Sequence, residues 1–187
     1  MLYRAGAKRN VQTTNPMTTR SIVIFPDPRL RTKAQPVSAF DPVLQRLVSD
    51  LFETMREANG LGLAATQIAE LLRVFVMDVS EDGSCPIAFV NPVIVSRKGQ
   101  QKRQEGCLSI PGVYADVVRA AEIHIQAFDP LGQPFERTAV ALEAVCIQHE
   151  IDHLDGHLFI DHLSPLKRER ALGSLRVGGE RSASGIS

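Results

Sequence analysis

Apolar residues recur at helical spacing in the segment DPVLQRLVSDLFETMREANG, residues 41–60. With 3.6 residues per turn, these positions form one stripe along a helix, which predicts an amphipathic helix packed on a core. Asp41 can cap its first turn and Pro42 suits the first helical position, while Asn59 and Gly60 favour its end. The stripe consists of Leu44, Leu47, Val48, Leu51, Phe52 and Met55.

Four later segments are short, rich in β-branched and aromatic residues, and bounded by turn residues, which predicts strands. They are residues 73–79, 87–96, 122–128 and 134–142. Two further helices are predicted over 143–155 and 164–176. Because the strands cluster before a late helix, the pattern favours an α+β domain.

Composition adds few constraints to this picture. The 187 residues suit one domain, apolar residues make up 44%, charged residues 22%, and the formal net charge is zero. We therefore expect no nucleic-acid cofactor and no membrane partner, since there is neither a basic excess nor an apolar run of about 20 residues. Three cysteines cannot all pair, which favours a reducing compartment.

The two ends differ in composition from the rest. Residues 1–26 contain no Asp or Glu, and the last eleven are rich in Gly and Ser. We expect a flexible leader over 1–16, a catalytic domain over 17–176 and a disordered tail over 177–187. The expected location is the bacterial cytoplasm, or an organelle if the leader is a transit peptide.

The segment QHEIDHLDG, residues 148–156, carries an H-E-x-x-H motif in a predicted helix. Residues four apart share a helix face, so His149 and His153 can direct ring nitrogens at one metal ion. Glu150 lies roughly 100° further round the helix, where it can act as a base on metal-activated water. The alternative is a buried helix with two hydrogen-bonded histidines, although apolar flanks leave all three side chains in need of partners.

A catalytic site of this kind needs a third protein ligand. Phe159 stands where a metzincin protease has its third histidine, so that pattern fails. His157 and Cys146 would spread the ligands over roughly 10 Å of helix, much longer than metal–ligand bonds. Glu169 is expected at the surface and His124 on a polar strand face, whereas His162, beside Asp161, has no partner at a ligand spacing.

Cys107 in QEGCLSIPG, residues 104–112, is the best candidate for this ligand. Its segment has the Gly and Pro content of a turn or strand end, which can approach the helix from elsewhere in the fold. A cysteine and two histidines leave a fourth position open, as catalytic zinc sites do. Alone, Cys107 would be an ordinary buried thiol, but together with the H-E-x-x-H motif it predicts a Cys107–His149–His153 site.

The segment GLGLAATQI, residues 60–68, follows the first predicted helix. It lacks the G-K-[ST] of a phosphate loop, so its glycines indicate a tight turn or a close backbone approach. Gln67 can direct an amide donor into a site.

These three segments, GLGLAATQI, EGCLSIPG and QHEIDHLDG, resemble in this order the three motifs of peptide deformylase. The similarity extends from about Ile22 to Lys167 and covers most of the chain. It implies mixed or antiparallel sheets packed around a central metal-binding helix, with an N-terminal and a C-terminal helix.

The resemblance also implies a chemistry, the removal of the N-formyl group from the initiator methionine of nascent polypeptides. Cys107, His149 and His153 would hold one divalent metal ion, Fe²⁺ by family preference, for which Zn²⁺, Ni²⁺ or Co²⁺ can substitute. Glu150 would be the general base and acid. A transient contact with the ribosome is expected, because the substrate emerges there.

Further roles are implied around the metal. Gln67 and the backbone N–H of Leu108 would stabilise the oxyanion. Gly62 would lie at the substrate cleft, Arg119 would lie near the peptide, and the peptide backbone would bond near Gly62 and Gly112.

The methionine side chain needs an apolar slot beside the metal, for which the candidates are Cys146, Ile147 and Ile110. Two other classes of function stay open at this point. A metalloprotease would use the same H-E-x-x-H motif, and a structural site would use the metal only to hold the fold together.

Overall fold

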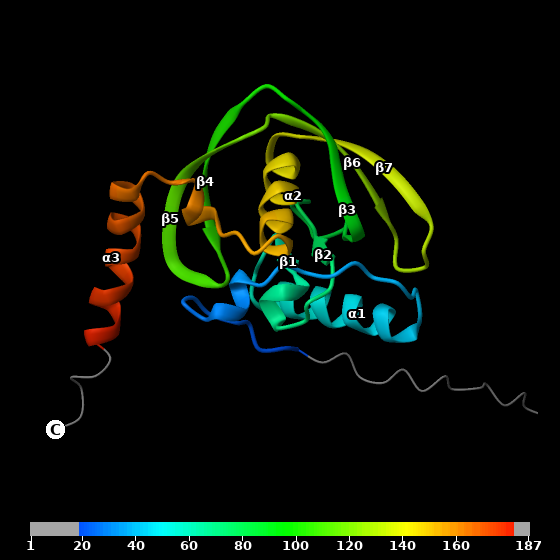
Figure 1. Cartoon of the computed structure of the whole chain (residues 1–187), viewed down its shortest axis with the longest axis horizontal. Coiled ribbons are helices and arrows are strands. Elements are labelled where there is room, and N and C mark those ends of the chain that lie inside the picture. The colour runs from blue at the N-terminus through cyan, green and yellow to red at the C-terminus, as the bar shows by residue number, and fades with distance from the viewer. Residues whose placement is uncertain (1–18, 182–187) are drawn as a thin grey trace, which may run out of the picture.

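A central helix, α2 (Ala141–Leu154), lies between two antiparallel sheets in this computed structural model (Figure 1). The larger sheet has the order β1-β2-β3-β6-β7, and the smaller consists of β4 and β5. This architecture confirms the predicted α+β class. The strands of the larger sheet are β1 (Gly62–Ala64), β2 (Val74–Met77), β3 (Ile87–Lys98), β6 (Glu122–Phe128) and β7 (Pro134–Val140), and those of the smaller are β4 (Gln101–Cys107) and β5 (Ile110–Arg119).

The structure describes the backbone of residues 19–181 and the side chains of residues 19–173. The predicted leader, 1–16, lies outside these residues. The C-terminal helix, α3 (Pro165–Arg181), runs further than predicted, so the first five residues of the expected tail are helical. Residues 182–187 of that tail lie outside the described part. Within the described part, no helix is both long and apolar enough to cross a lipid bilayer.

Strand β2 is buried on both faces, which explains its unbroken apolar sequence. Phe75 and Met77 pack with α2, whereas Val74 and Val76 pack with α1 (Pro42–Glu57) on the other side. Successive side chains of a strand point to opposite faces, so one apolar strand joins both clusters. Packing against the sheet thereby fixes the position of α2 and of the H-E-x-x-H motif that it carries.

Helix α1 begins as its sequence predicts. The Asp41 carboxylate accepts hydrogen bonds from the backbone N–H groups of Val43 and Leu44, both at 3.0 Å. The apolar stripe faces the sheet, where Leu51 is fully buried and Met55 is 2% exposed. This packing holds the loop after α1, which contains Gly60 and Gly62, against the start of β1.

The third apolar cluster joins the β4–β5 ribbon to the C-terminal part of the chain. Val113 and Val117 of β5 pack with Phe159 of the short helix η3 (Phe159–His162) and with Leu172 of α3. The ribbon therefore stands at a fixed distance from α2 and can present Cys107 to it. Two other short helices complete the chain, η1 (Pro28–Arg31) and η2 (Ala65–Ile68).

Candidate metal centre and substrate cavity

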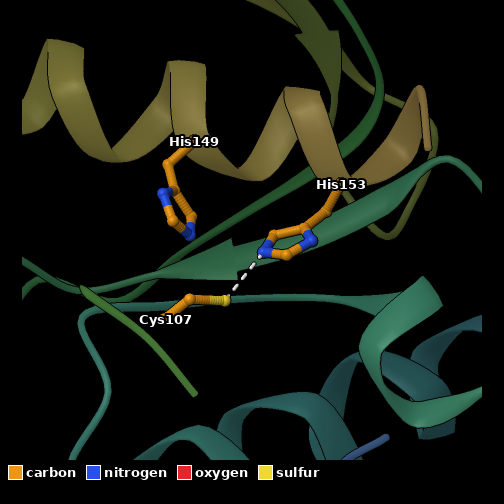
Figure 2. A group of neighbouring side chains, drawn as sticks. All are labelled: Cys107, His149 and His153. Carbon is orange, nitrogen blue, oxygen red and sulfur yellow. Dashed lines mark hydrogen bonds between the residues drawn. The ribbon is translucent and has the colours of Figure 1, made fainter. Parts of the chain in front are cut away.

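The three predicted ligands converge. The ligand atoms of Cys107, His149 and His153 all lie within 4.8 Å of one another. Figure 2 shows both imidazoles projecting from α2 toward the thiol, with the Cys107 Sγ atom 3.2 Å from His153 Nε2. Bond lengths of about 2.0–2.3 Å place the ligands of a tetrahedral metal roughly 3.5 Å apart, so this donor set fits one ion.

Local structure explains how Cys107 reaches the helix. The β4–β5 pairing shifts register between Gly106 and Cys107, at the end of β4. Such a bulge turns the strand and changes the direction of the side chain that follows it. Burial raises the pKa of the Cys107 thiol, but the nearby His153 and His149 outweigh this effect and hold the pKa well below its usual value, which favours the thiolate a metal requires.

Glu105 orients His149 from behind. Its Oε2 atom lies 2.8 Å from His149 Nδ1, which leaves Nε2 free to serve as a metal ligand. Both carboxylate oxygens also accept from Arg119, at 2.8 and 2.9 Å. Burial raises the pKa of Glu105, but the hydrogen bonds from Arg119 and His149 outweigh it and lower the pKa to about 2. Glu105 is thus an ionised, buried carboxylate that holds the His149 ring in place.

Arg119 has a different role from the predicted one. It is only 6% exposed, and its guanidinium contacts Glu105 and Asp152, the latter at 2.5 Å. His162 Nε2 lies 2.7 Å from the same Asp152 oxygen. The prediction that Arg119 lies at the peptide-binding cleft is therefore wrong, because the side chain lies behind the metal ligands in an ion-pair network.

Glu150 is buried beside the ligand cluster. It is 3% exposed, and its Oε2 atom has no hydrogen-bond partner among the described residues. Burial raises the pKa of this carboxyl to about 7, against the opposing effect of His149 and His153. A Cβ atom on Gly62 would lie 2.4 Å from Glu150 Oε1, so the carboxylate occupies space that only a glycine leaves.

Gln67 also contacts Cys107. Its Oε1 accepts from the backbone N–H of Ala64, and its amide group donates to Ser109 Oγ at 3.1 Å and Cys107 Sγ at 3.6 Å. These bonds orient the amide with its donor end toward the cluster. Leu108 follows Cys107 in the turn, half-buried against Gly60.

These residues surround one cavity of about 340 Å³. Cys107, His149 and Glu150 line one part of it, and apolar side chains of α2 line another. Glu105, Gly62, Gln67 and Leu108 also line the cavity. The apolar lining includes Leu61, Leu108, Tyr114, Leu142, Val145 and Cys146.

Two predictions for the methionine slot are wrong, and a third predicted substrate residue, Gly112, lies outside the cavity lining. Ile147 is fully buried between α2 and the sheet, and Ile110 is buried in the cluster of β5 and η3, so neither lines the cavity. Gly112 has a φ of 76° at the start of β5 and likewise does not line it. Of the three methionine-slot candidates, only Cys146 lies on the cavity wall.

Sequence patterns did not identify two kinds of site residue. Glu105 stands two positions before Cys107 in a polar run, and its link to Arg119 exists only once β4 and β5 have paired. Leu142 and Val145 do carry a signal, because they precede His149 by seven and four residues and therefore share its helix face.

Comparisons with known proteins agree with this geometry. The family model described as Polypeptide deformylase matches residues 19–169. The "Peptide deformylase 2" of Xanthomonas campestris pv. campestris is 56% identical over 156 residues, covering 82% of this chain and 92% of the relative. The "Peptide deformylase" of Xylella fastidiosa strain M12 is 54% identical over 170 residues, covering 89% and 100%.

Solved structures show the same fold. A crystal structure of a peptide deformylase from Legionella pneumophila is 48% identical, with a TM-score of 0.85, covering 90% of this chain and 100% of that one. A peptide deformylase from Synechococcus elongatus, in complex with actinonin, is 38% identical with a TM-score of 0.81, covering 84% and 88%.

Proposed function

The chain belongs to the polypeptide deformylase family and removes the N-formyl group from the initiator methionine of nascent polypeptides, and we propose that Cys107, His149 and His153 form the metal centre of this hydrolysis. The observation that carries the proposal is the convergence of these three donors beside a buried glutamate, at a cavity that Cys107, His149 and Glu150 line. The residues matched by the family model lie within the proposed catalytic domain, 17–176.

One thiolate and two imidazoles suit a divalent transition metal, and we infer Fe²⁺, with Zn²⁺, Ni²⁺ or Co²⁺ as substitutes. When bound, such a metal lowers the pKa of water and polarises a carbonyl oxygen. Glu105 supports this role, because a carboxylate on Nδ1 keeps the His149 ring in the orientation and tautomer that expose Nε2.

We assign the proton transfers to Glu150. Water adds to the formyl carbon, Glu150 takes its proton, and the same proton passes to the amine nitrogen as the C–N bond breaks. The products are formate and a free amino terminus. A pKa of about 7 lets one carboxyl group accept and return a proton near neutrality, and a nearby cation favours the ionised form that acts first.

Gln67 and the backbone N–H of Leu108 would stabilise the negative oxygen that develops on the formyl group. The Gln67 amide supports this role because its donor end already faces Cys107. One such donor contributes about 3–4 kcal/mol to the transition state.

An apolar part of the cavity wall can accommodate the methionine side chain. Leu142, Val145 and Cys146 lie on the α2 face that carries His149, so the slot extends from the metal toward the start of the helix. Because formyl carries only hydrogen beyond its carbonyl group, a narrow cavity next to the metal can accept it and exclude acetyl by steric overlap.

The peptide backbone can pair with the outer edge of β1. The Leu61 carbonyl accepts from Asp78, whereas the Ala64 N–H points away from β2 to Gln67. Polar groups of alternate residues on a strand point the same way, so those of Gly62 also face away from β2, toward the cavity. Strand addition there would bind the peptide with little dependence on its sequence.

We further infer a transient contact with the ribosome, where the substrate emerges, and a location in the bacterial cytoplasm. The basic segment LKRER at the start of α3 and the bacterial sources of the relatives support these proposals.

The test is formate release from a formyl-Met peptide by protein purified without oxygen and loaded with Fe²⁺, beside the Glu150→Ala variant. We expect turnover by the parent, a loss of about 10²–10⁴-fold in the variant, and equal metal content in both. An acetyl-Met peptide is the specificity control. Absence of turnover by the fully loaded parent would overturn the assignment of this site.

A further inference from the structure

The turn between β4 and β5 is buried at its tip. Cys107 pairs with Ile110, so Leu108 and Ser109 are the two residues that connect the strands. Ser109 is fully buried and Leu108 is half-buried. Loop tips normally lie in solvent and are mobile, so the burial of this tip indicates that other parts of the chain hold it in position.

The N-terminal segment 22–25 holds this turn next to the short helix η2. The backbone N–H of Phe25 donates to the carbonyl oxygen of Ser109 at 2.8 Å, and that of Val23 donates to the carbonyl oxygen of Gln67 at 2.7 Å. Val23 is 6% exposed and packs in the apolar cluster of the ribbon, which fixes the segment itself. One short segment therefore ties the backbones of Gln67 and Ser109 together.

A hydrogen bond between the two side chains completes this connection. Gln67 Nε2 donates to Ser109 Oγ at 3.1 Å, while Gln67 Oε1 accepts from the backbone N–H of Ala64 at 2.9 Å. A primary amide has two N–H donors. Because Ala64 fixes the oxygen and Ser109 binds one N–H, the plane of the amide is set and its second N–H is directed toward Cys107, whose Sγ lies 3.6 Å from Nε2.

This geometry bears on the two groups assigned to the oxyanion. Two donors can stabilise one oxygen only if both lie within hydrogen-bond distance of it, so their spacing matters as much as their presence. One donor is the Gln67 amide, and the other is the backbone N–H of Leu108, the neighbour of Ser109 in the turn. Ser109 does not line the cavity, so any effect that it has on the reaction must pass through residues that do.

We propose that Ser109 is a positioning residue for the oxyanion donors. Its hydroxyl fixes the direction of the Gln67 amide, and its place in the turn fixes the spacing between that amide and the N–H of Leu108. This inference rests on the proposed function, in which these two groups stabilise the oxyanion.

Ser109→Ala separates the two contributions. It removes the hydroxyl but leaves the backbone hydrogen bond to Phe25, so the turn and the N–H of Leu108 keep their place. The last torsion of a glutamine side chain has broad energy wells, so the Gln67 amide is then free to rotate. We expect kcat for a formyl-Met peptide to fall roughly 10- to 100-fold. KM and metal content should stay nearly unchanged, because the donor acts mainly in the transition state.

The test is a double-mutant cycle on the Fe²⁺-loaded full chain, with Ser109→Ala, Gln67→Ala and the double variant. Gln67→Ala should lower kcat by roughly 10²–10³-fold, as expected for the loss of one oxyanion donor. The double variant should be no slower than Gln67→Ala, because the amide that Ser109 orients is then absent. A general loosening of the fold would instead multiply the two losses.

Thr54→Val is the matched control, because it also removes one buried hydroxyl group. Thr54 is 2% exposed, and its Oγ1 donates to the Asp50 carbonyl at 2.7 Å and accepts from the Arg20 N–H at 3.0 Å, away from the cavity. This variant should lower Tm and leave kcat unchanged. Thermal unfolding of every sample ensures that all variants are compared at a temperature where they are folded.

Undiminished kcat in Ser109→Ala, or losses that multiply in the double variant, would overturn the inference while deformylation itself stands. Undiminished kcat in Gln67→Ala would remove the oxyanion role of Gln67 and this inference with it. Absence of turnover by the parent would overturn the proposed function.

Discussion

A methyl group added at Gly62 should displace the Glu150 carboxylate, to which we assign the proton transfers, and leave the fold intact. In Gly62→Ala the new Cβ would lie 2.4 Å from Glu150 Oε1 and 2.9 Å from Cys146 Sγ. Ordinary contact begins at 3.4 Å, so the carboxylate oxygen must move by 1.0 Å (3.4 − 2.4). This atom ends a flexible side chain, which can turn away at small cost, unlike a backbone group.

The displacement sets the expected magnitude. A shift of about 1 Å in a reacting group costs roughly 10²-fold in rate, which corresponds to about 2.7 kcal/mol in the activation free energy. The free energy of unfolding should change by less than about 1 kcal/mol, because alanine also reduces the conformational freedom of the unfolded chain. Metal content should stay the same, since Gly62 does not contact the three ligands.

The assay is formate release at saturating formyl-Met peptide, with metal analysis and thermal unfolding of the same samples. Gly173→Ala is the control, because a Cβ at Gly173 meets no atom within 4 Å. Undiminished kcat in Gly62→Ala would refute the argument that the glycine makes room for Glu150. A fall in Tm large enough to account for lost activity would refute it as well.

Three further predictions concern the support of the site. Glu105→Gln removes the charge that orients His149 and pairs with Arg119. The affinity for Fe²⁺ should therefore fall about 10- to 100-fold, as measured by chelator competition. Unchanged affinity would contradict this role of Glu105. The pKa of Glu105 is about 2 in the folded chain against an ordinary 4.5, so its stabilising effect is complete above pH 4.5 and is lost as the pH falls toward 2. In metal-free protein, the difference in Tm between the parent and Glu105→Gln should therefore close over that pH range. A difference in Tm that stays constant would count against this prediction. In Gly156→Ala, a Cβ would lie 2.6 Å from the Arg31 carbonyl oxygen, at a residue whose φ is 77°. We expect a loss of about 1–3 kcal/mol in the free energy of unfolding, seen as a Tm lower by roughly 3–10 °C. An unaltered Tm would show that the backbone adapts freely.

Local signals predicted α1 and the helix that carries the two histidines. The Asp41 cap and the apolar stripe act over a few residues, and two histidines four apart share a face of any helix. The coordination chemistry of a catalytic metal then favoured Cys107 as the third ligand, and the structure places its thiol close to both histidines.

Strands β4 and β5 escaped prediction for a physical reason. Their inward positions include Glu105 and Arg119, two charged residues that the sequence marks as exposed. They are buried because they neutralise each other across the ribbon, and no local pattern reports that pairing. The placement of Arg119 in the substrate cleft had another origin, because it was carried over from the family resemblance. The contacts of Gly62 with Glu150 likewise join segments far apart in the chain, so they follow from the tertiary fold alone.

A metal ion held by Cys107 and His153 would be a removable cross-link between distant parts of the chain. The two ligands are 46 residues apart in sequence, and they belong to the β4–β5 ribbon and to the helix packed on the larger sheet. Closing a loop of this length is entropically costly in the unfolded chain, whereas the folded chain holds the ligands together in advance. Metal binding therefore acts selectively on the folded state, and a free metal concentration 100 times the Kd adds about 2.7 kcal/mol to stability. In a cell that limits this metal, the protein would lose its activity and also part of the stability that keeps the β4–β5 ribbon packed against α2.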